Sequence, residues 1–291
     1  MLLHRYFSSH VFETLKEARL RTSRISSFND SFEWSYVSVG KITPEEAKES
    51  LLYLLRNPTF RRCINQKLGN LASDEQIRKV LSDLKGEDLA EIWPDIVKRT
   101  ELSLERGRQI RDKEARVICF SDPEWVERLK KQGEILLWSH YANKNAGIRI
   151  GFEFPDGIKG LFEITPITYQ ENRPEVVFSP SLEADEQTLE AIKKASSVKS
   201  KAWEYEGEFR LFTRIDLCER REVKKCHAPA VEEHFLRFKR EWVKSVDFGV
   251  FCPDTEIQLV DDLLKTDYPN VIPRKAEMHK TEYAFEYKQV R

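Results

Sequence analysis

Residues 148–154 constrain the fold most, because they form the clearest strand pattern in this 291-residue chain. Ile148, Ile150, Phe152 and Phe154 alternate with other residue types, as in a strand that is buried on one face. No regular alternation of strands and helices surrounds this segment, so the pattern favours an α+β fold over a doubly wound sheet. We expect a mixed or mainly antiparallel sheet, with a split sheet among the options. Further strands are expected at 116–120, 162–169, 205–213, 243–251 and 282–290, short strands on either side of a helix at 11–18, and helices starting at 122–124 and spanning 182–197 and 254–265.

Residues 43–115 carry a different pattern. Apolar residues recur there at helical spacings among many charges, and Thr43-Pro44 resembles a helix N-terminus. We therefore expect a helical insertion at 43–115 within a single domain that spans residues 1–291.

The charge balance argues against a chain that is drawn to polyanions as a whole. The 48 Lys and Arg against 49 Asp and Glu leave a formal net charge of -1, so nucleic-acid binding would require a local patch. The five scattered cysteines are typical of free thiols in a reducing compartment. No apolar stretch approaches the ~20 residues that span a bilayer, and the first residues lack the apolar core of a signal peptide. We expect a cytoplasmic protein with no membrane partner.

The first candidate motif is Phe28–Glu33, in which two carboxylates and an amide lie between two aromatic residues. Such a loop would place Asn29 and Asp30 in a cleft, where they would bind substrate. The alternative is a turn held by the side chains of Asn29 and Asp30, with Phe28 and Phe32 anchoring the loop in the core.

The second motif is Leu136–Asn143, which contains Ser139, His140 and Tyr141 in a row. Histidine exchanges protons near neutral pH, and tyrosine stacks on planar ligands or donates a hydrogen bond. The alternative is a buried aromatic segment in which His140 only satisfies a backbone carbonyl.

The third motif is Trp203–Arg210. If it is a strand, its three glutamates and Arg210 share one face. Three like charges on one face destabilise a sheet unless they serve a function, and Gly207 would let a ligand or another backbone approach closely. The alternative is an exposed edge strand in which Arg210 balances the glutamates.

The signatures of several enzyme classes are absent. The sequence has no glycine-rich nucleotide motif, no serine-hydrolase elbow and no H-E-x-x-H. Cys218, Cys226 and His227 are irregularly spaced and lack a fourth zinc ligand, so we predict no metal site. Pro253-Asp254 and Glu286–Lys288 match elements of metal-dependent nucleases, although Asp254 also suits a helix N-cap.

The three motifs and Cys119–Ser121, in this order, resemble a family of bacterial proteins of unknown function. Members carry F-N-D-P-F-E, C-F-S, L-W-x-H-Y-A before a G-F strand, and W-x-Y-E-x-E-x-R. Here Ser31 replaces the usual proline, and Asn145-Ala146 stands where a second histidine is common. The resemblance implies that the motifs form one site. Members sometimes lie near phage-defence genes, which implies a role in defence or toxicity.

The chain also resembles ADP-ribosyltransferases, which cleave the nicotinamide bond of NAD in the cleft of a split β-structure. These enzymes combine a histidine or arginine on an N-terminal strand, a serine or tyrosine on a middle element and a glutamate on a late strand. The residues that this resemblance places there are His4 or Arg5, then Ser139 and Tyr141, then Glu206 and Glu208.

The leading hypothesis is an NAD-consuming enzyme with NAD as its substrate. One alternative is a metal-dependent nuclease or phosphoesterase that uses Asp30, His140 and the glutamates. Another is a non-catalytic receptor for a small molecule or peptide. For the leading hypothesis the expected catalytic residues are Glu206, Glu208, His140 and Tyr141, and the expected substrate-binding residues are Asn29, Asp30, Ser139, Arg210, His4 and Arg5.

Overall fold

The computed structural model describes most of the chain and divides it into two compact units. The first unit contains residues 1–33, 112–171 and 199–291, and the second contains residues 34–111 and 172–198. We predicted a helical insertion at 43–115 and a helix at 182–197, and most of both segments lies outside the described residues. The single domain over residues 1–291 stays a prediction. The described residues are 1–30, 32–33, 38–39, 105–129, 132–155, 163–176, 193–223 and 231–290, with isolated positions between 62 and 102.

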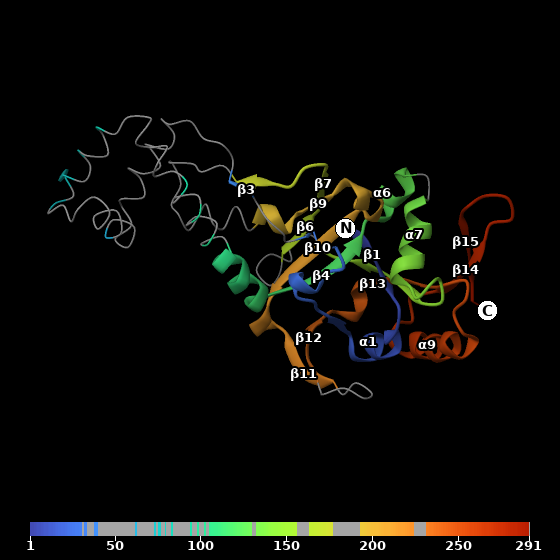
Figure 1. The fold of residues 1–291 in the computed structure, drawn as a ribbon. Coiled ribbons are helices and arrows are strands. Elements are labelled where there is room, and N and C mark those ends of the chain that lie inside the picture. Colours follow the sequence, from blue (N-terminus) through green and yellow to red (C-terminus); the bar gives the residue numbers. More distant parts are fainter. Residues whose placement is uncertain are drawn as a thin grey trace. The chain divides into compact units, whose positions relative to one another are not determined.

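The first unit is built on a large mixed sheet (Figure 1). Across the described residues the sheet has eight strands, in the order β15-β14-β13-β5-β1-β4-β10-β6. Strands β13 and β14 run parallel, and the other neighbours pair antiparallel. This confirms the α+β class with a mixed, mainly antiparallel sheet. The strands are β1 (Leu2–Phe7), β4 (Ala115–Ser121), β5 (Ile148–Glu153), β6 (Glu163–Pro166), β10 (Glu208–Arg214), β13 (Val243–Phe248), β14 (Pro273–Met278) and β15 (Phe285–Gln289).

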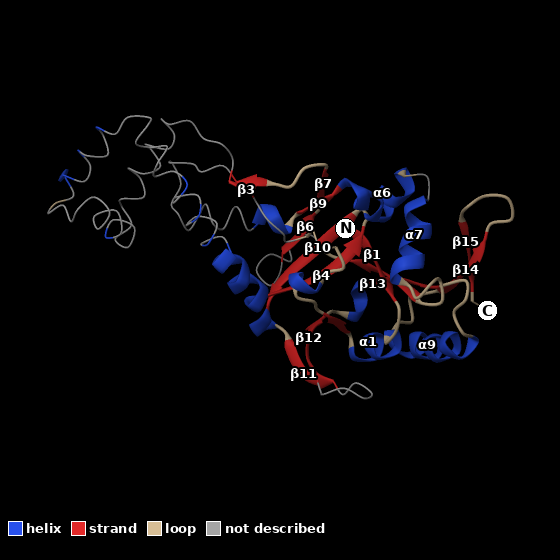
Figure 2. Cartoon of the chain, in the orientation of Figure 1, coloured by secondary structure: helices blue, strands red, loops and turns tan. Residues whose placement is uncertain are grey.

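Helices and smaller strands complete the described structure (Figure 2). In the second unit, β3 (Ser38–Val39) and β8 (Glu175–Val176) pair in parallel. None of the described helices is long and apolar enough to cross a membrane. The other elements are α1 (Val11–Glu17), α6 (Pro123–Arg128), α7 (Gln132–Tyr141) and α9 (Asp254–Asp267), the 3-10 helices η1 (Ile25–Ser27), η2 (Lys201–Glu206), η3 (Ile215–Leu217) and η4 (Arg240–Trp242), and the strands β2 (Arg19–Arg21), β7 (Thr168–Gln170), β9 (Val198–Ser200), β11 (Glu219–Val223) and β12 (Val231–Arg237).

One face of the sheet carries the apolar core. Ile150 and Phe152 of β5 lie in this core with residues of α1 and α9, such as Leu15 and Val260. Helix α9 begins at Asp254, whose carboxylate lies in the positive first turn but does not cap it, so the predicted N-cap was wrong by one residue.

The opposite face of the sheet is polar and also buried. Arg149 of β5 points to this face, where it is 5% exposed and bonds Asp247 of β13 and Glu134 of α7. The strand predicted at 148–154 is therefore present, but the expectation that it is buried on one face only was wrong. Buried charges require partners, and on this face they have them.

The sheet opens between β1 and β4. Among the described residues these strands pair only at His4 and Ser121, whereas β1 pairs with β5 from Leu2 to Phe7. Further along β4, Val117 exchanges both backbone hydrogen bonds with Ser23 instead.

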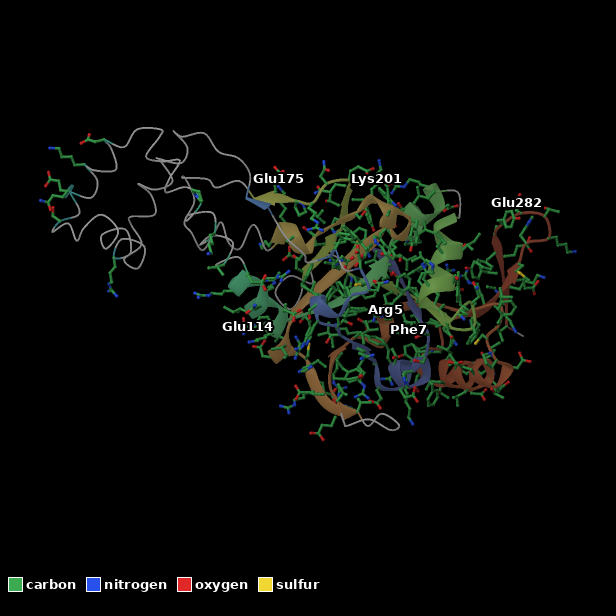
Figure 3. All side chains as sticks on the ribbon, viewed as in Figure 1. Arg5, Phe7, Glu114, Glu175, Lys201 and Glu282 are labelled. Carbon is green, nitrogen blue, oxygen red and sulfur yellow. The ribbon has the colours of Figure 1, made fainter. Side chains whose placement is uncertain are left out.

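The Arg5 side chain fills part of this opening. Cys119 lies between the two pairing points of β4, and its carbonyl accepts a 3.0 Å hydrogen bond from Arg5 Nη1. Buried carbonyls need a hydrogen-bond donor, and here the Arg5 guanidinium donates in place of a backbone amide from a neighbouring strand. Figure 3 shows Arg5 and Phe7 of β1 within the first unit.

Candidate functional site

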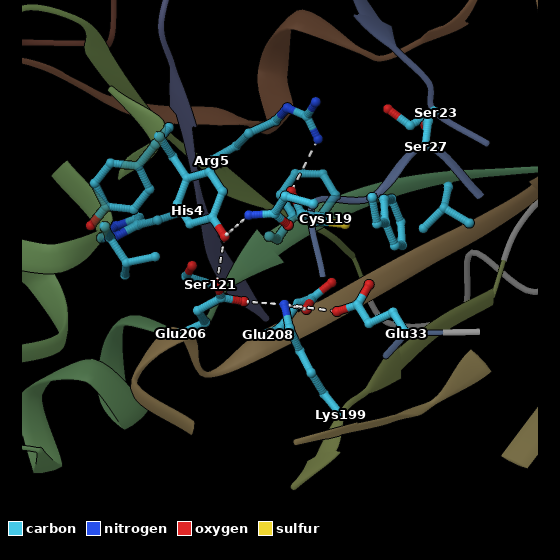
Figure 4. Close-up of a pocket in the computed structure, with 17 residues that line it drawn as sticks. His4, Arg5, Ser23, Ser27, Glu33, Cys119, Ser121, Lys199, Glu206 and Glu208 are labelled. Atoms are coloured by element: carbon cyan, nitrogen blue, oxygen red, sulfur yellow. Dashed lines mark hydrogen bonds and ion pairs between the residues drawn. The ribbon is translucent and has the colours of Figure 1, made fainter. Parts of the chain in front are cut away.

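A cavity of about 280 Å³ lies where β1 and β4 separate (Figure 4). Residues from both faces of these strands line it, because alternate side chains point to opposite faces and the gap is open to both. The lining residues are His4, Arg5, Tyr6, Ser23, Ser27, Phe28, Asn29, Glu33, Val117, Cys119, Phe120, Ser121, Leu137, Tyr141, Lys199, Glu206 and Glu208.

Tyr141 reaches the cavity from the last residue of α7. The helix stops there because Asn143, Lys144 and Asn145 adopt positive φ angles of 46°, 53° and 68° and reverse the chain into β5. The Tyr141 hydroxyl donates a 2.5 Å hydrogen bond to Glu206 Oε1. Burial, followed by the nearby Glu206 carboxylate, raises the pKa of Tyr141 well above its usual value, so this hydroxyl stays protonated.

Glu206 lies at the end of η2, not on a strand. The prediction that a strand already runs at Tyr205 was wrong: residues 201–206 form a 3-10 helix whose start is capped by Ser200, and β10 begins only at Glu208. Gly207 joins the two elements with φ 50°. A Cβ at this position would also lie 2.8 Å from Cδ1 of Trp125.

Lys199 is the centre of a buried ionic cluster (Figure 4). Its ammonium lies 2.9 Å from Glu33 Oε1, 2.6 Å from Glu206 Oε2 and 3.0 Å from Glu208 Oε2. Arg210 adds a second cation, with contacts of 2.9 Å to Glu33 and 2.7 Å to Glu208. All five side chains are at most 5% exposed. Three carboxylates against two cations give the cluster a formal charge of -1 when all are ionised.

Glu206 and Glu208, two of the three glutamates of the third motif, have opposite pKa shifts. Burial raises the pKa of Glu206, although Lys199 opposes the effect. Burial also acts on Glu208, but Arg210 and Lys199 outweigh it and lower its pKa to about 2. Glu208 is therefore a fixed negative charge, whereas Glu206 is the carboxylate that exchanges a proton more readily at working pH.

The loop of the first motif presents Glu33 and Asn29, while Asp30 shapes the turn. Asp30 Oδ1 accepts a hydrogen bond of 2.8 Å from the Phe32 amide, and the Asp30 carbonyl accepts one of 3.1 Å from the Glu33 amide. Asp30 is buried and does not line the cavity. Asn29 Nδ2 lies 3.4 Å from the Tyr141 hydroxyl. Phe32 is 61% exposed, so it does not anchor the loop in the core.

The two β1 residues contribute a neutral ring and a cation. Burial, followed by the charges of Arg149 and Arg274, lowers the pKa of His4 well below its usual value, so the imidazole is neutral at neutral pH. Arg5 is a cation that lines the cavity.

His140 and Ser139 do not reach the cavity. His140 is exposed, and its Nδ1 lies 3.0 Å from the Tyr205 hydroxyl. Ser139 is half-buried, and its carbonyl accepts a hydrogen bond from the Lys144 amide. The structure thus brings six of the predicted residues to the cavity and places Asp30, Arg210, His140 and Ser139 behind or beside it. The six are His4, Arg5, Asn29, Tyr141, Glu206 and Glu208.

Lys199 and Glu33 were missed as site residues by the sequence reasoning. Glu33 was within the first motif but was not assigned a role. Lys199 lies outside every motif, and the only signal for it was the surplus of carboxylates in the third motif, since buried carboxylates need a cation.

The arrangement can perform carboxylate chemistry on a polar ligand. Glu206 faces the cavity beside a hydroxyl donor, and such a carboxylate can bind a substrate hydroxyl, stabilise a developing cation or accept a proton. Within the described residues, no group of three or more His, Cys, Asp or Glu side chains has a geometry that suits a metal ion.

Residues 137–211 match the family model DUF2971, described as a protein of unknown function. The match confirms the expected resemblance to such a family, and it covers the segment from Leu137 through the third motif into β10. Searches of curated proteins and of solved structures found no match to the chain.

Proposed function

We propose that the cavity is the active site of an NAD-consuming enzyme of ADP-ribosyltransferase type. Two of its residues, Tyr141 and Glu206, belong to the segment 137–211 that matches a family of unknown function. The observation that carries this proposal is the contact of 2.5 Å between Tyr141 and Glu206 in a cavity that His4 and Arg5 also line. Three segments that are far apart in the sequence thus meet at one opening in a sheet, in the order that the resemblance implies.

The proposed reaction begins with the bond between ribose C1′ and the nicotinamide nitrogen. Both bonding electrons leave with the nitrogen, so nicotinamide departs as a neutral molecule and the ribose becomes an oxocarbenium-like cation. Glu206 binds a ribose hydroxyl and stabilises this cation, a contact that strengthens in the transition state. Water or a side chain of a target then forms the new bond at C1′ and releases its proton.

The other cavity residues bind the substrate. Arg5 offers a guanidinium to the diphosphate, and the Tyr141 ring stacks on nicotinamide. The neutral His4 ring hydrogen-bonds a ribose hydroxyl. A cavity of about 280 Å³ suits the nicotinamide ribose portion of NAD.

Glu206 is the essential carboxylate in this proposal, rather than Glu208. Both oxygens of Glu208 are already engaged, since Arg210 Nε contacts Oε1 and Lys199 contacts Oε2. Among the described residues, the hydrogen bond to Glu206 Oε1 comes from a neutral hydroxyl, and a carboxylate oxygen has a further lone pair that can accept a hydrogen bond from a substrate hydroxyl.

Release of nicotinamide from NAD by the purified chain tests the proposal. We expect release by the wild type, a loss on the order of 10²–10³-fold in Glu206→Gln, and wild-type release in Glu204→Gln. Glu204 is the matched control because it lies in the same 3-10 helix but does not line the cavity. Stoichiometric NAD binding without release would point to a receptor. Chelator-sensitive cleavage of nucleic acid would point to a nuclease. Either result would overturn the proposal.

A role in bacterial defence or toxicity follows if the enzyme consumes NAD in the cell. Expression of the wild-type chain in bacteria is expected to lower cellular NAD and slow growth, while Glu206→Gln does neither. Equal toxicity of the two chains at equal expression would separate the toxicity from the proposed chemistry.

A further inference from the structure

The Glu206 carboxylate is buried, and an isolated carboxylate in such a place binds a proton and becomes neutral. A neutral group cannot stabilise a cation as an ionised carboxylate does. The site therefore needs a positive charge that is present before the substrate arrives.

Lys199 supplies that charge by direct contact. Its Nζ lies 2.6 Å from Glu206 Oε2, on the oxygen opposite the one that Tyr141 contacts. The two contacts fix the carboxylate from both sides. The ammonium itself is held by Glu33 at 2.9 Å and Glu208 at 3.0 Å, so three carboxylates define its position.

The surrounding groups shield the Lys199 ammonium from water. Its side chain is 4% exposed, and its ammonium lies 5.0 Å from the centre of the Trp203 ring. Arg210, the other cation of the cluster, lies between Glu33 and Glu208 and holds those two in place.

We propose that Lys199 is a positioning residue that keeps the Glu206 carboxylate ionised and directed into the cavity before substrate binds. Its effect on catalysis rests on the proposed function, whereas its effect on Glu206 does not. Two experiments separate these claims.

The first experiment follows the ¹³C signal of the Glu206 carboxyl group during a pH titration without substrate. The signal is assigned by its loss in Glu206→Gln. In Lys199→Met the midpoint is expected to rise by about one pH unit or more, since an opposite charge at contact distance shifts a carboxyl group by that amount. Lys199→Arg, which keeps the charge, should titrate near the wild type. An unchanged midpoint in folded Lys199→Met would overturn the proposal, whatever the enzyme does.

The second experiment measures kcat for nicotinamide release against pH. Near pH 6 the Lys199→Met variant should lose about tenfold or more, and the loss should shrink as the pH rises toward about 9 and Glu206 ionises. Lys199→Arg should recover most of the rate. Lys201→Met is the matched control, because Lys201 is 54% exposed at the surface (Figure 3). A loss of equal size at every pH would indicate a purely structural role and overturn the proposal.

A double variant guards against misfolding. Lys199→Met with Glu33→Gln removes one positive and one negative charge, so the cluster keeps its formal charge of -1 while Glu206 still lacks its contact. The raised midpoint should persist in this variant, and a midpoint that returns to the wild-type value would contradict the proposal. If the wild type releases no nicotinamide at all, the proposed function fails, and the titration still decides the role of Lys199.

Discussion

Glu206 and Glu208 are two residues apart, yet their surroundings drive their pKa values in opposite directions. Glu208 lies between Arg210 and Lys199, whereas Glu206 has Lys199 on one side and the uncharged Tyr141 hydroxyl on the other. Pairs of carboxyl groups whose pKa values are driven apart in this way commonly take different roles at enzyme sites. Under the proposed function we expect Glu206 to perform the chemistry and Glu208 to supply a structural charge.

Tyr141→Phe tests the contact between α7 and Glu206. The change removes one hydroxyl donor to Glu206 and leaves the ring, so we expect roughly a tenfold lower kcat with a small change in KM. Tyr205→Phe is the matched control, since its hydroxyl contacts His140 instead. Equal loss in both variants, measured as nicotinamide release, would mean that the Tyr141 contact has no special role.

Glu208→Gln tests the structural charge. It leaves Arg210 and Lys199 without one of their buried partners, and breaking a buried ion pair in this way costs about 3–5 kcal/mol. Urea unfolding at neutral pH measures the loss. A change within about 0.5 kcal/mol, as at exposed positions, would show that the cluster does not stabilise the fold.

Two elements present the site, and each ends in a backbone conformation that the sequence signals only in part. Helix α7 ends in three residues of positive φ before β5, and η2 ends at Gly207. The sequence marks Gly207 but not the 3-10 helix before it, because alternating charges in 203–210 fit a strand equally well. Once Trp125 packs against Gly207, tertiary contact decides between the two.

Gly207→Ala tests this junction. A φ of 50° costs a residue with a Cβ roughly 1–2 kcal/mol, and the close approach to Trp125 adds to that. We expect a lower urea midpoint together with slower nicotinamide release, because a changed backbone at position 207 would move the preceding residue, Glu206. Full stability and full activity in this variant would show that the junction tolerates a side chain and does not set the position of Glu206.

At the scale of the molecule, the sheet has one apolar and one polar buried face, and the cavity lies where it opens between β1 and β4. The strands at 116–120, 148–154 and 243–251 were predictable because β-branched and aromatic residues recur in them. The opening was not predictable, since it depends on where β1 stops pairing and Ser23 takes over. Lys199 was hidden for the same reason: its role arises from partners at positions 33, 206 and 208 that only the fold assembles.

The buried cluster also sets the pH dependence of stability. The pKa of Glu208 is about 2 in the folded chain and has a reference value of 4.5, so the unfolded state binds more protons between these values. The stabilisation is therefore present above about pH 4.5 and is lost as the pH falls toward 2. Glu206 has the opposite sign, because its pKa is raised in the folded chain and its contribution declines as the pH rises through that value.

Acid unfolding of Glu208→Gln measures this effect. The variant should start less stable at neutral pH and lose less stability than the wild type between about pH 4.5 and pH 2, because it no longer carries the depressed carboxyl group. Parallel stability curves for the two chains across this range would show that Glu208 is not the group responsible.

A crystal structure of the Glu206→Gln variant with NAD tests the central claim most directly, because under the proposed function we expect the substitution to slow cleavage and to keep the shape of the site. We predict the nicotinamide ribose in the opening between β1 and β4, with a ribose hydroxyl at the position 206 side chain, the nicotinamide on Tyr141 and the diphosphate beside Arg5. NAD bound at any other place, with this opening free of it, would contradict the account.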